Sequence, residues 1–277
     1  MRVLVATDLS KPADEAVRQG AALAGADGTL AVMHVVPSLQ TISMLFPQQH
    51  AQDALDVAKI TVRVMDALRE QVGRTGGREA EFFVDQGTDY AEIVRRAESW
   101  KADIVVVGSH GHSGLSWVLG GVAERVVRHA HCRVLVARAS AARGCVLAGT
   151  DLSEPSLPAV TAAAEEARRR GVALKTVHAV GFVEREVLYL LAPHRSDQRE
   201  PARVRLTEMM HKAGATGESL ILDGSAAAAI VREAEASGAE LIVIATHGKT
   251  GIARVFGSVA EKLVRTAPCS VLVVRAG

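Results

Sequence analysis

Two glycine-rich segments have the composition of a phosphate-binding loop. Residues 108–114 read GSHGHSG and lead to Gly120 and Gly121, whereas residues 245–251 read ATHGKTG and lead to Gly257 and Ser258. Glycine lets backbone N–H groups approach a ligand closely. A Gly-Gly or Gly-Ser pair at the start of a helix adds unpaired N–H groups and the positive end of the helix dipole. The two segments therefore predict anion sites of the kind that suits a phosphate.

Two common phosphate-binding motifs do not fit these segments. A Walker loop requires a glycine five residues before the Gly-Lys-Thr at 248–250, and that position is Val243. A dinucleotide-binding fingerprint would place G-x-G-x-x-G after the first strand, where the chain reads Thr-Asp-Leu-Ser. Any phosphate would therefore be bound in another way.

The chain repeats itself. Residues 7–10 (TDLS) return at 150–153, and residues 122–138 (VAERVVRHAHCRVLVAR) return at 259–275 (VAEKLVRTAPCSVLVVR). A period of about 140 residues is too long for a solenoid, so each copy is expected to be a whole domain. We place the two domains at residues 1–140 and 143–277.

Strands and helices are expected to alternate within each copy. In the first copy we predict strands at 2–7, 29–35, 79–84, 103–108 and 132–138, and helices at 51–72, 89–100 and 119–130. Ser10 is expected to cap a further helix, with Pro12 in its first turn. This order predicts an α/β fold of two tandem doubly wound parallel five-stranded sheets, each with helices on both faces. Such sheets bind ligands where the strand order reverses, which favours the residues after strands one and four.

The glycine segments resemble the G-x2-G-x9-G-[S/T] pattern of the universal stress protein family, whose first strand ends in an Asp, as at Asp8 and Asp151 here. The resemblance spans the chain twice and identifies a tandem universal stress protein. It implies the adenine-nucleotide alpha-hydrolase-like fold and a cleft for ATP or another adenine nucleotide, with or without Mg, in a stress-response sensor. The nucleotide-binding residues it implies are Asp8, Val35, Gly108, His110, Gly111, Gly120 and Gly121 in the first copy, and Asp151, Ala179, Ala245, His247, Gly248, Gly257 and Ser258 in the second.

Both copies depart from the family pattern. Eight residues, one fewer than in the family, separate Gly111 from Gly120 and Gly248 from Gly257. Gly121 replaces the expected Ser or Thr, and Ala245 replaces the first glycine. Two functions therefore stay open: a nucleotide-binding sensor, or a protein-interaction scaffold that no longer binds nucleotide. Catalysis beyond a slow Mg-dependent ATPase has no support, because no nucleophile elbow or Walker lysine is present.

Several side chains have a structural interpretation beside the functional one. Asp8 and Asp151 are turn residues or nucleotide ligands, and His34 and His178 are core or cleft residues. The spacing of His129, His131 and Cys132 matches no usual zinc pattern, so we expect no protein-ligated metal. Cys132 and Cys269 are expected to be small buried residues, and the apolar residues 39–49 to form a lid or an interface.

Composition narrows the classes of partner. The 32 Lys and Arg residues balance the 31 Asp and Glu residues, and a net charge of +1 gives no general attraction to nucleic acid or an anionic membrane. The three cysteines suit a reducing compartment, and neither a signal peptide nor a membrane-length apolar run is present, so we expect a cytoplasmic protein. We expect the fifth strands to pair the two copies as an internal pseudo-dimer, with a homodimer as further assembly.

Overall fold

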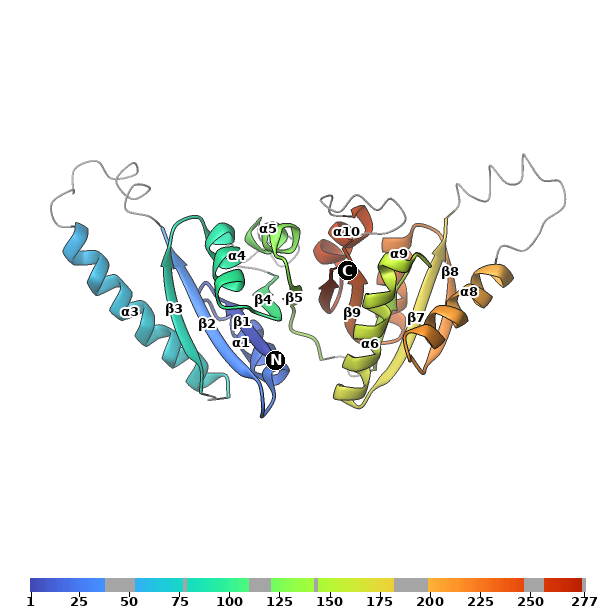
Figure 1. The fold of residues 1–277 in the computed structure, drawn as a ribbon, viewed down its shortest axis with the longest axis horizontal. Coiled ribbons are helices and arrows are strands. Elements are labelled where there is room, and N and C mark those ends of the chain that lie inside the picture. The colour runs from blue at the N-terminus through green and yellow to red at the C-terminus, as the bar shows by residue number, and fades with distance from the viewer. Residues whose placement is uncertain are drawn as a thin grey trace. The chain divides into compact units, whose positions relative to one another are not determined.

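The computed structural model describes residues 1–37, 53–76, 79–109, 121–141, 144–181, 199–246 and 257–275, with the backbone alone for 53–58. It separates into two compact units, Met1–Ala137 and Arg138–Gly277. The first unit runs from blue to green in Figure 1, and the second from green to red. Within the described ranges, no helix is both long and apolar enough to cross a bilayer.

The first unit alternates strands and helices from its first residues onward. Its elements in chain order are β1 (Arg2–Ala6), α1 (Asp14–Ala24), β2 (Thr29–Val36), α3 (Asp53–Arg74), β3 (Glu81–Gln86), α4 (Asp89–Ser99), β4 (Ile104–Gly108), α5 (Gly121–His129) and β5 (Arg133–Ala137). The strands lie within two residues of the segments that hydrophobicity predicts.

The second unit repeats this order. Its elements are β6 (Cys145–Gly149), a short 3-10 helix (Glu154–Ser156), α6 (Leu157–Arg170), β7 (Ala173–Val180), α8 (Arg199–Lys212), β8 (Glu218–Asp223), α9 (Ala226–Ala236), β9 (Ala239–Ala245), α10 (Ser258–Thr266) and β10 (Ser270–Val274). The repeat in the sequence is therefore a repeat of structure.

The described residues of each unit contain five parallel strands. Their order is β3-β2-β1-β4-β5 in the first unit and β8-β7-β6-β9-β10 in the second. The order reverses between β1 and β4, and between β6 and β9, because the chain leaves the first strand toward one edge and returns toward the other. This confirms the doubly wound fold.

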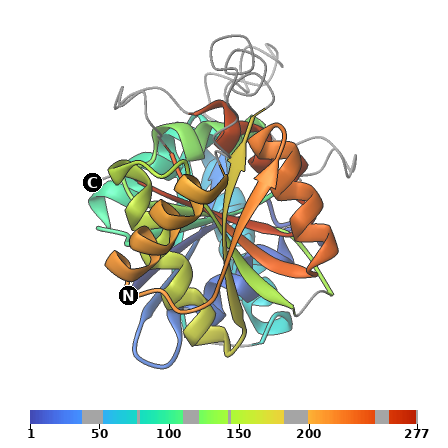
Figure 2. The same cartoon turned by 90° about the vertical axis from the view of Figure 1, so that its right-hand side faces the viewer.

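Helices cover both faces of each sheet. In the first unit α1 packs against β1 and α3, whereas α4 packs against α5 and β2. Figure 1 shows α3 on one side of these strands and α4 and α5 on the other, as right-handed crossovers require. Figure 2 shows the twist of the strands in the second unit, which faces the viewer.

The core is aliphatic, in keeping with an aromatic content of 3%. The central strands β1, β4, β6 and β9 are buried along nearly their whole length. Helix α6 buries a face made largely of alanine, so its backbone lies close to the sheet. Parallel strands covered on both faces read as continuous apolar segments for this reason.

The expected start of the first helix is wrong. Helix α1 begins at Asp14 with Ala13 at its N-cap position, and Lys11–Ala13 form a turn before it. The Ser10 hydroxyl instead donates to Asp8 Oδ1 at 2.6 Å, and it accepts only a long 3.4 Å hydrogen bond from the Ala13 N–H. Because the Ser10 side chain is hydrogen-bonded to Asp8, it does not cap the helix, and the helix begins after Pro12.

Two glycines in helices of the first unit should respond to alanine with opposite signs. A Cβ on Gly20 of α1 would lie 2.3 Å from Val5 Cγ2, whereas a Cβ on Gly73 of α3 would meet no atom within 4 Å. We expect Gly20→Ala to destabilise the unit by about 1–3 kcal/mol through overpacking. Gly73→Ala should stabilise it by at most about 1 kcal/mol through helix propensity.

Urea unfolding followed by tryptophan fluorescence measures both effects, because both tryptophans, Trp100 and Trp117, belong to the first unit. Equal stability of Gly20→Ala and the wild type would contradict the close packing of α1 on β1.

Candidate functional site

A cavity lies beside the carboxyl ends of β1 and β4 in the first unit, and of β6 and β9 in the second. It measures about 150 Å³ in the first unit and about 260 Å³ in the second. Both cavities sit where the strand order reverses, the position at which open parallel sheets bind ligands. Three of the sequence-predicted residues line the first cavity (Asp8, Val35 and Gly108) and five line the second (Asp151, Ala179, Ala245, Gly257 and Ser258).

One further predicted residue that the structure describes, Gly121, is not among the residues that line the first cavity. Gly121 is the first residue of α5 and is exposed, while its neighbours Val122 and Ala123 line the first cavity. Five predicted nucleotide-binding residues lie outside the described residues: His110, Gly111, Gly120, His247 and Gly248. The apolar segment 39–49 lies outside them as well.

The aspartate after the first strand makes a turn at the edge of each cavity. Asp8 Oδ1 accepts hydrogen bonds from the Ser10 N–H at 3.0 Å and from the Ser10 hydroxyl. Asp151 Oδ1 accepts the same pair from Ser153. Each carboxylate therefore has a structural role in the turn and lines the cavity as well, so the two interpretations of these residues are compatible.

The residue after each aspartate has a left-handed backbone, with φ 65° at Leu9 and 63° at Leu152. This conformation costs a residue with a Cβ roughly 1–2 kcal/mol. Burial of the side chain offsets the cost in the second unit, where Leu152 packs against Ala202 and Leu206. The Thr7 and Thr150 hydroxyls accept the N–H groups of the two leucines at 3.0 Å. The backbone thus turns sharply at the cavity and holds the preceding aspartate there.

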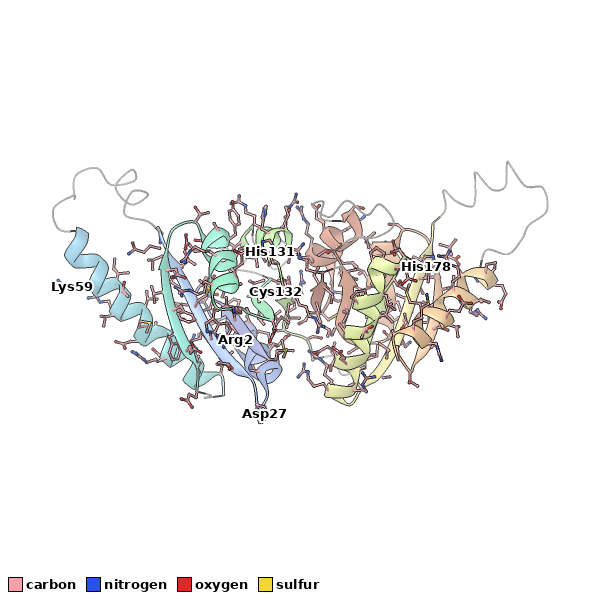
Figure 3. The ribbon with its side chains drawn as sticks, in the orientation of Figure 1. Arg2, Asp27, Lys59, His131, Cys132 and His178 are labelled. Carbon is pink, nitrogen blue, oxygen red and sulfur yellow. The ribbon has the colours of Figure 1, made fainter. Side chains whose placement is uncertain are left out.

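A histidine on the second strand lines each cavity, and its ring is oriented by the backbone of the first strand. His34 Nδ1 lies 2.7 Å from the Thr7 carbonyl oxygen, and His178 Nδ1 lies 2.9 Å from that of Thr150. Because a carbonyl oxygen only accepts, Nδ1 carries the proton in both rings. Figure 3 labels His178 on β7. Neither histidine is among the predicted nucleotide-binding residues, and its recurrence on the second strand of both copies is the sequence signal for its place in the cavity wall.

The start of α10 forms one wall of the second cavity. Gly257 occupies the N-cap position with an extended backbone (φ −64°, ψ 137°), and no side chain among the described residues caps the helix. Its N–H donates to the Thr246 carbonyl oxygen at 3.0 Å, which ties the helix start to the end of β9. The first N–H groups of such a helix favour an anion.

A buried glutamine supports the aspartate turn in the first unit. Gln71 of α3 is fully buried; its Oε1 accepts from the Thr7 hydroxyl at 3.0 Å, and its Nε2 donates to Asp14 Oδ1 at 2.7 Å. Arg74 also binds Asp14, at 2.8 Å. Burial opposes ionisation of Asp14, but the hydrogen bonds from Arg74 and Gln71 outweigh it and lower its pKa. The second unit places Met209 against the Thr150 hydroxyl instead.

The described part of the chain offers no clustered metal-ligand set, and its cysteines differ in burial. Its residues contain no group of three or more His, Cys, Asp or Glu side chains arranged to hold a metal ion. Cys269 is buried as predicted, and burial raises its pKa to about 12 despite the charge of Arg138. Cys132 is partly exposed, contrary to the prediction, because it precedes β5 in a bend beside His131 (Figure 3).

Comparison with known proteins finds similarity along the whole chain. Residues 1–138 and 144–275 each match the model of the universal stress protein family. A universal stress protein of Mycolicibacterium smegmatis is 28% identical over an alignment of 298 positions. The alignment covers 99% of this chain and 96% of that protein. The crystal structure of a universal stress protein from Archaeoglobus fulgidus has the same fold, with a TM-score of 0.71 at 19% identity over 100% of this chain and 96% of its own. A universal stress protein solved in complex with cAMP covers 50% of this chain and 100% of its own, at 27% identity and a TM-score of 0.38.

Proposed function

Because the chain belongs to the universal stress protein family and contains its domain twice, we propose that it binds an adenine nucleotide and acts as a sensor in the stress response. The proposed site is the cavity after strands one and four. The observation that carries the proposal is the convergence on one cavity of residues from four separate segments of the second unit, here Asp151, Ala179, Ala245 and Gly257. The glycine motif independently favours a phosphate there.

The chemistry of the walls fits the parts of a nucleotide. The Asp151 carboxylate can accept hydrogen bonds from a nucleoside, and the backbone near Ala179 can flank its base. The Ser258 hydroxyl and the first N–H groups of α10 can donate to phosphate oxygens. Apolar residues such as Ile230 and Ile244 complete the walls.

We propose binding without fast turnover. Among the described residues that line the second cavity, Asp151 and His178 alone have ionisable side chains. Asp151 is engaged in its turn, and His178 donates from Nδ1 to a backbone carbonyl. This set favours recognition over hydrolysis.

Thermal unfolding with ATP, AMP and cAMP, each with Mg²⁺ and with EDTA, tests the proposal. A ligand at 100 times its Kd should add about 2.7 kcal/mol to the free energy of unfolding. The absence of any shift at millimolar nucleotide would reject nucleotide binding and favour the alternative, a protein-interaction scaffold.

A further inference from the structure

Resting on the proposed function, we infer that the two cavities are not equivalent: the second unit binds the nucleotide, and the first unit rejects it through Asp89. One chain would then bind one nucleotide. The inference rests on a charge difference and a volume difference between the corresponding walls of the two cavities.

The charge difference lies at the first residue of the helix after the third strand. Asp89 opens α4 and lines the first cavity, whereas Ala226 opens α9 and lines the second. These positions correspond, because four residues later Ile93 and Ile230 line the same cavities. The first turn of α4 also contains Glu92, while the first turn of α9 contains no acidic residue.

The described walls of the first cavity thus contain two carboxylates, Asp8 and Asp89, and no Lys or Arg. Those of the second contain one carboxylate, Asp151, and again no Lys or Arg. A nucleotide brings several negative charges, and like charges oppose binding wherever solvent screening is incomplete. The first cavity therefore disfavours a nucleotide more than the second.

The volumes point the same way. Pockets for small molecules start at about 300 Å³; the second cavity, at about 260 Å³, is close to this size, and the first, at about 150 Å³, is far below it. The walls also differ on the first strand, where Ala6 of the first unit corresponds to Gly149 of the second. A Cβ on Gly149 would lie 3.0 Å from Ile230 Cδ1, so the methyl group would crowd this wall.

Asp89 has an ordinary structural role too, since an acidic residue stabilises the start of a helix. For the same reason Ala226→Asp should keep α9 folded, so a change in affinity would report the added charge in the cavity and not unfolding. Ala228→Asp is the matched control, because it adds the same charge to the same helix at a residue that is not among the cavity walls.

Isothermal titration of the intact chain with ATP, in EDTA and in Mg²⁺, decides the matter. We expect one site per chain, at least a tenfold loss of affinity in Ala226→Asp, and affinity within twofold of wild type in Ala228→Asp. Asp89→Ala should add a second, weaker binding event. Circular dichroism and the unfolding midpoint of each variant verify that it is folded.

Each other result has a definite meaning. Two sites in the wild type, including a second one that needs Mg²⁺, or unchanged affinity in Ala226→Asp, would overturn the inference while nucleotide binding itself stood. A single site in Asp89→Ala would remove Asp89 as the determinant. No heat with ATP, together with no shift in thermal unfolding with any of the nucleotides, would instead reject the proposed function.

Discussion

Gly257→Val is expected to weaken ATP binding at least tenfold, which corresponds to about 1.4 kcal/mol of binding free energy. Gly257 lines the second cavity, and a Cβ there would lie 3.0 Å from the Thr246 carbonyl oxygen. The branched side chain would occupy space at the start of α10 and displace a ligand from the first N–H groups of the helix. The backbone φ of −64° is one that valine adopts, so the change acts through the added side chain and not through the backbone conformation.

The control is Gly121→Val at the start of α5. A Cβ on Gly121 would meet no atom within 4 Å, and this residue does not line the first cavity. Titration calorimetry should give the same affinity for Gly121→Val and wild type. If Gly257→Val bound ATP as tightly as wild type, the cavity would not be the nucleotide site.

Truncation of Gln71 to alanine should cost the first unit about 2–4 kcal/mol of stability, the range for removing a buried side chain together with its hydrogen bonds. The change opens a void beneath the aspartate turn and removes the hydrogen bonds to Thr7 and Asp14. Tryptophan fluorescence during urea unfolding isolates this unit. Gln19→Ala, at a half-buried residue of α1 that donates a hydrogen bond to Glu15 at 2.8 Å, should cost less, about 0.5–1.5 kcal/mol.

The stability that Gln71→Ala removes from the first unit should also depend on pH. The folded state lowers the pKa of Asp14 below its ordinary 3.8, so this group contributes stability above that pH and loses it as the pH falls through the folded value. Gln71 is one cause of the lowered pKa, and its removal should therefore cost less at pH 3 than at pH 7. A cost within 0.5 kcal/mol of zero at pH 7 would show that the network does not stabilise the unit.

The sequence predicted the features of this fold that depend on local patterns. Continuous apolar segments located β1 and β4, and the order of elements with right-handed crossovers was enough to predict where the strand order reverses. The same reasoning placed Asp8 and Asp151 at the cavities, because a residue after the first strand of such a sheet must lie there.

Contacts between distant residues could not be predicted in this way. The apolar period of α3 predicts which of its side chains are buried, but it does not predict that the polar Gln71 is one of them. The hydrogen bond between Gln71 and Thr7 joins positions 64 residues apart. The Ser10 hydroxyl donates to Asp8 instead of capping the helix, and this depends on the left-handed backbone at Leu9. Leucine seldom adopts a positive φ, so the sequence does not predict this turn. The sequence shows that Asp89 corresponds to Ala226, but only the structure shows that both residues line a cavity.

The pairing of β1 with β4 has a consequence for how each domain acquires its site during folding. Val3 pairs with Ile104, so about a hundred residues must be made before the two strands can meet. Closing so long a loop slows folding, because its entropy is lost before the contacts compensate. The cavity walls come from both strands and from α5, which follows them. A nascent domain therefore has no ligand site until its last helix has been synthesised, and the ligand can stabilise only the completed domain.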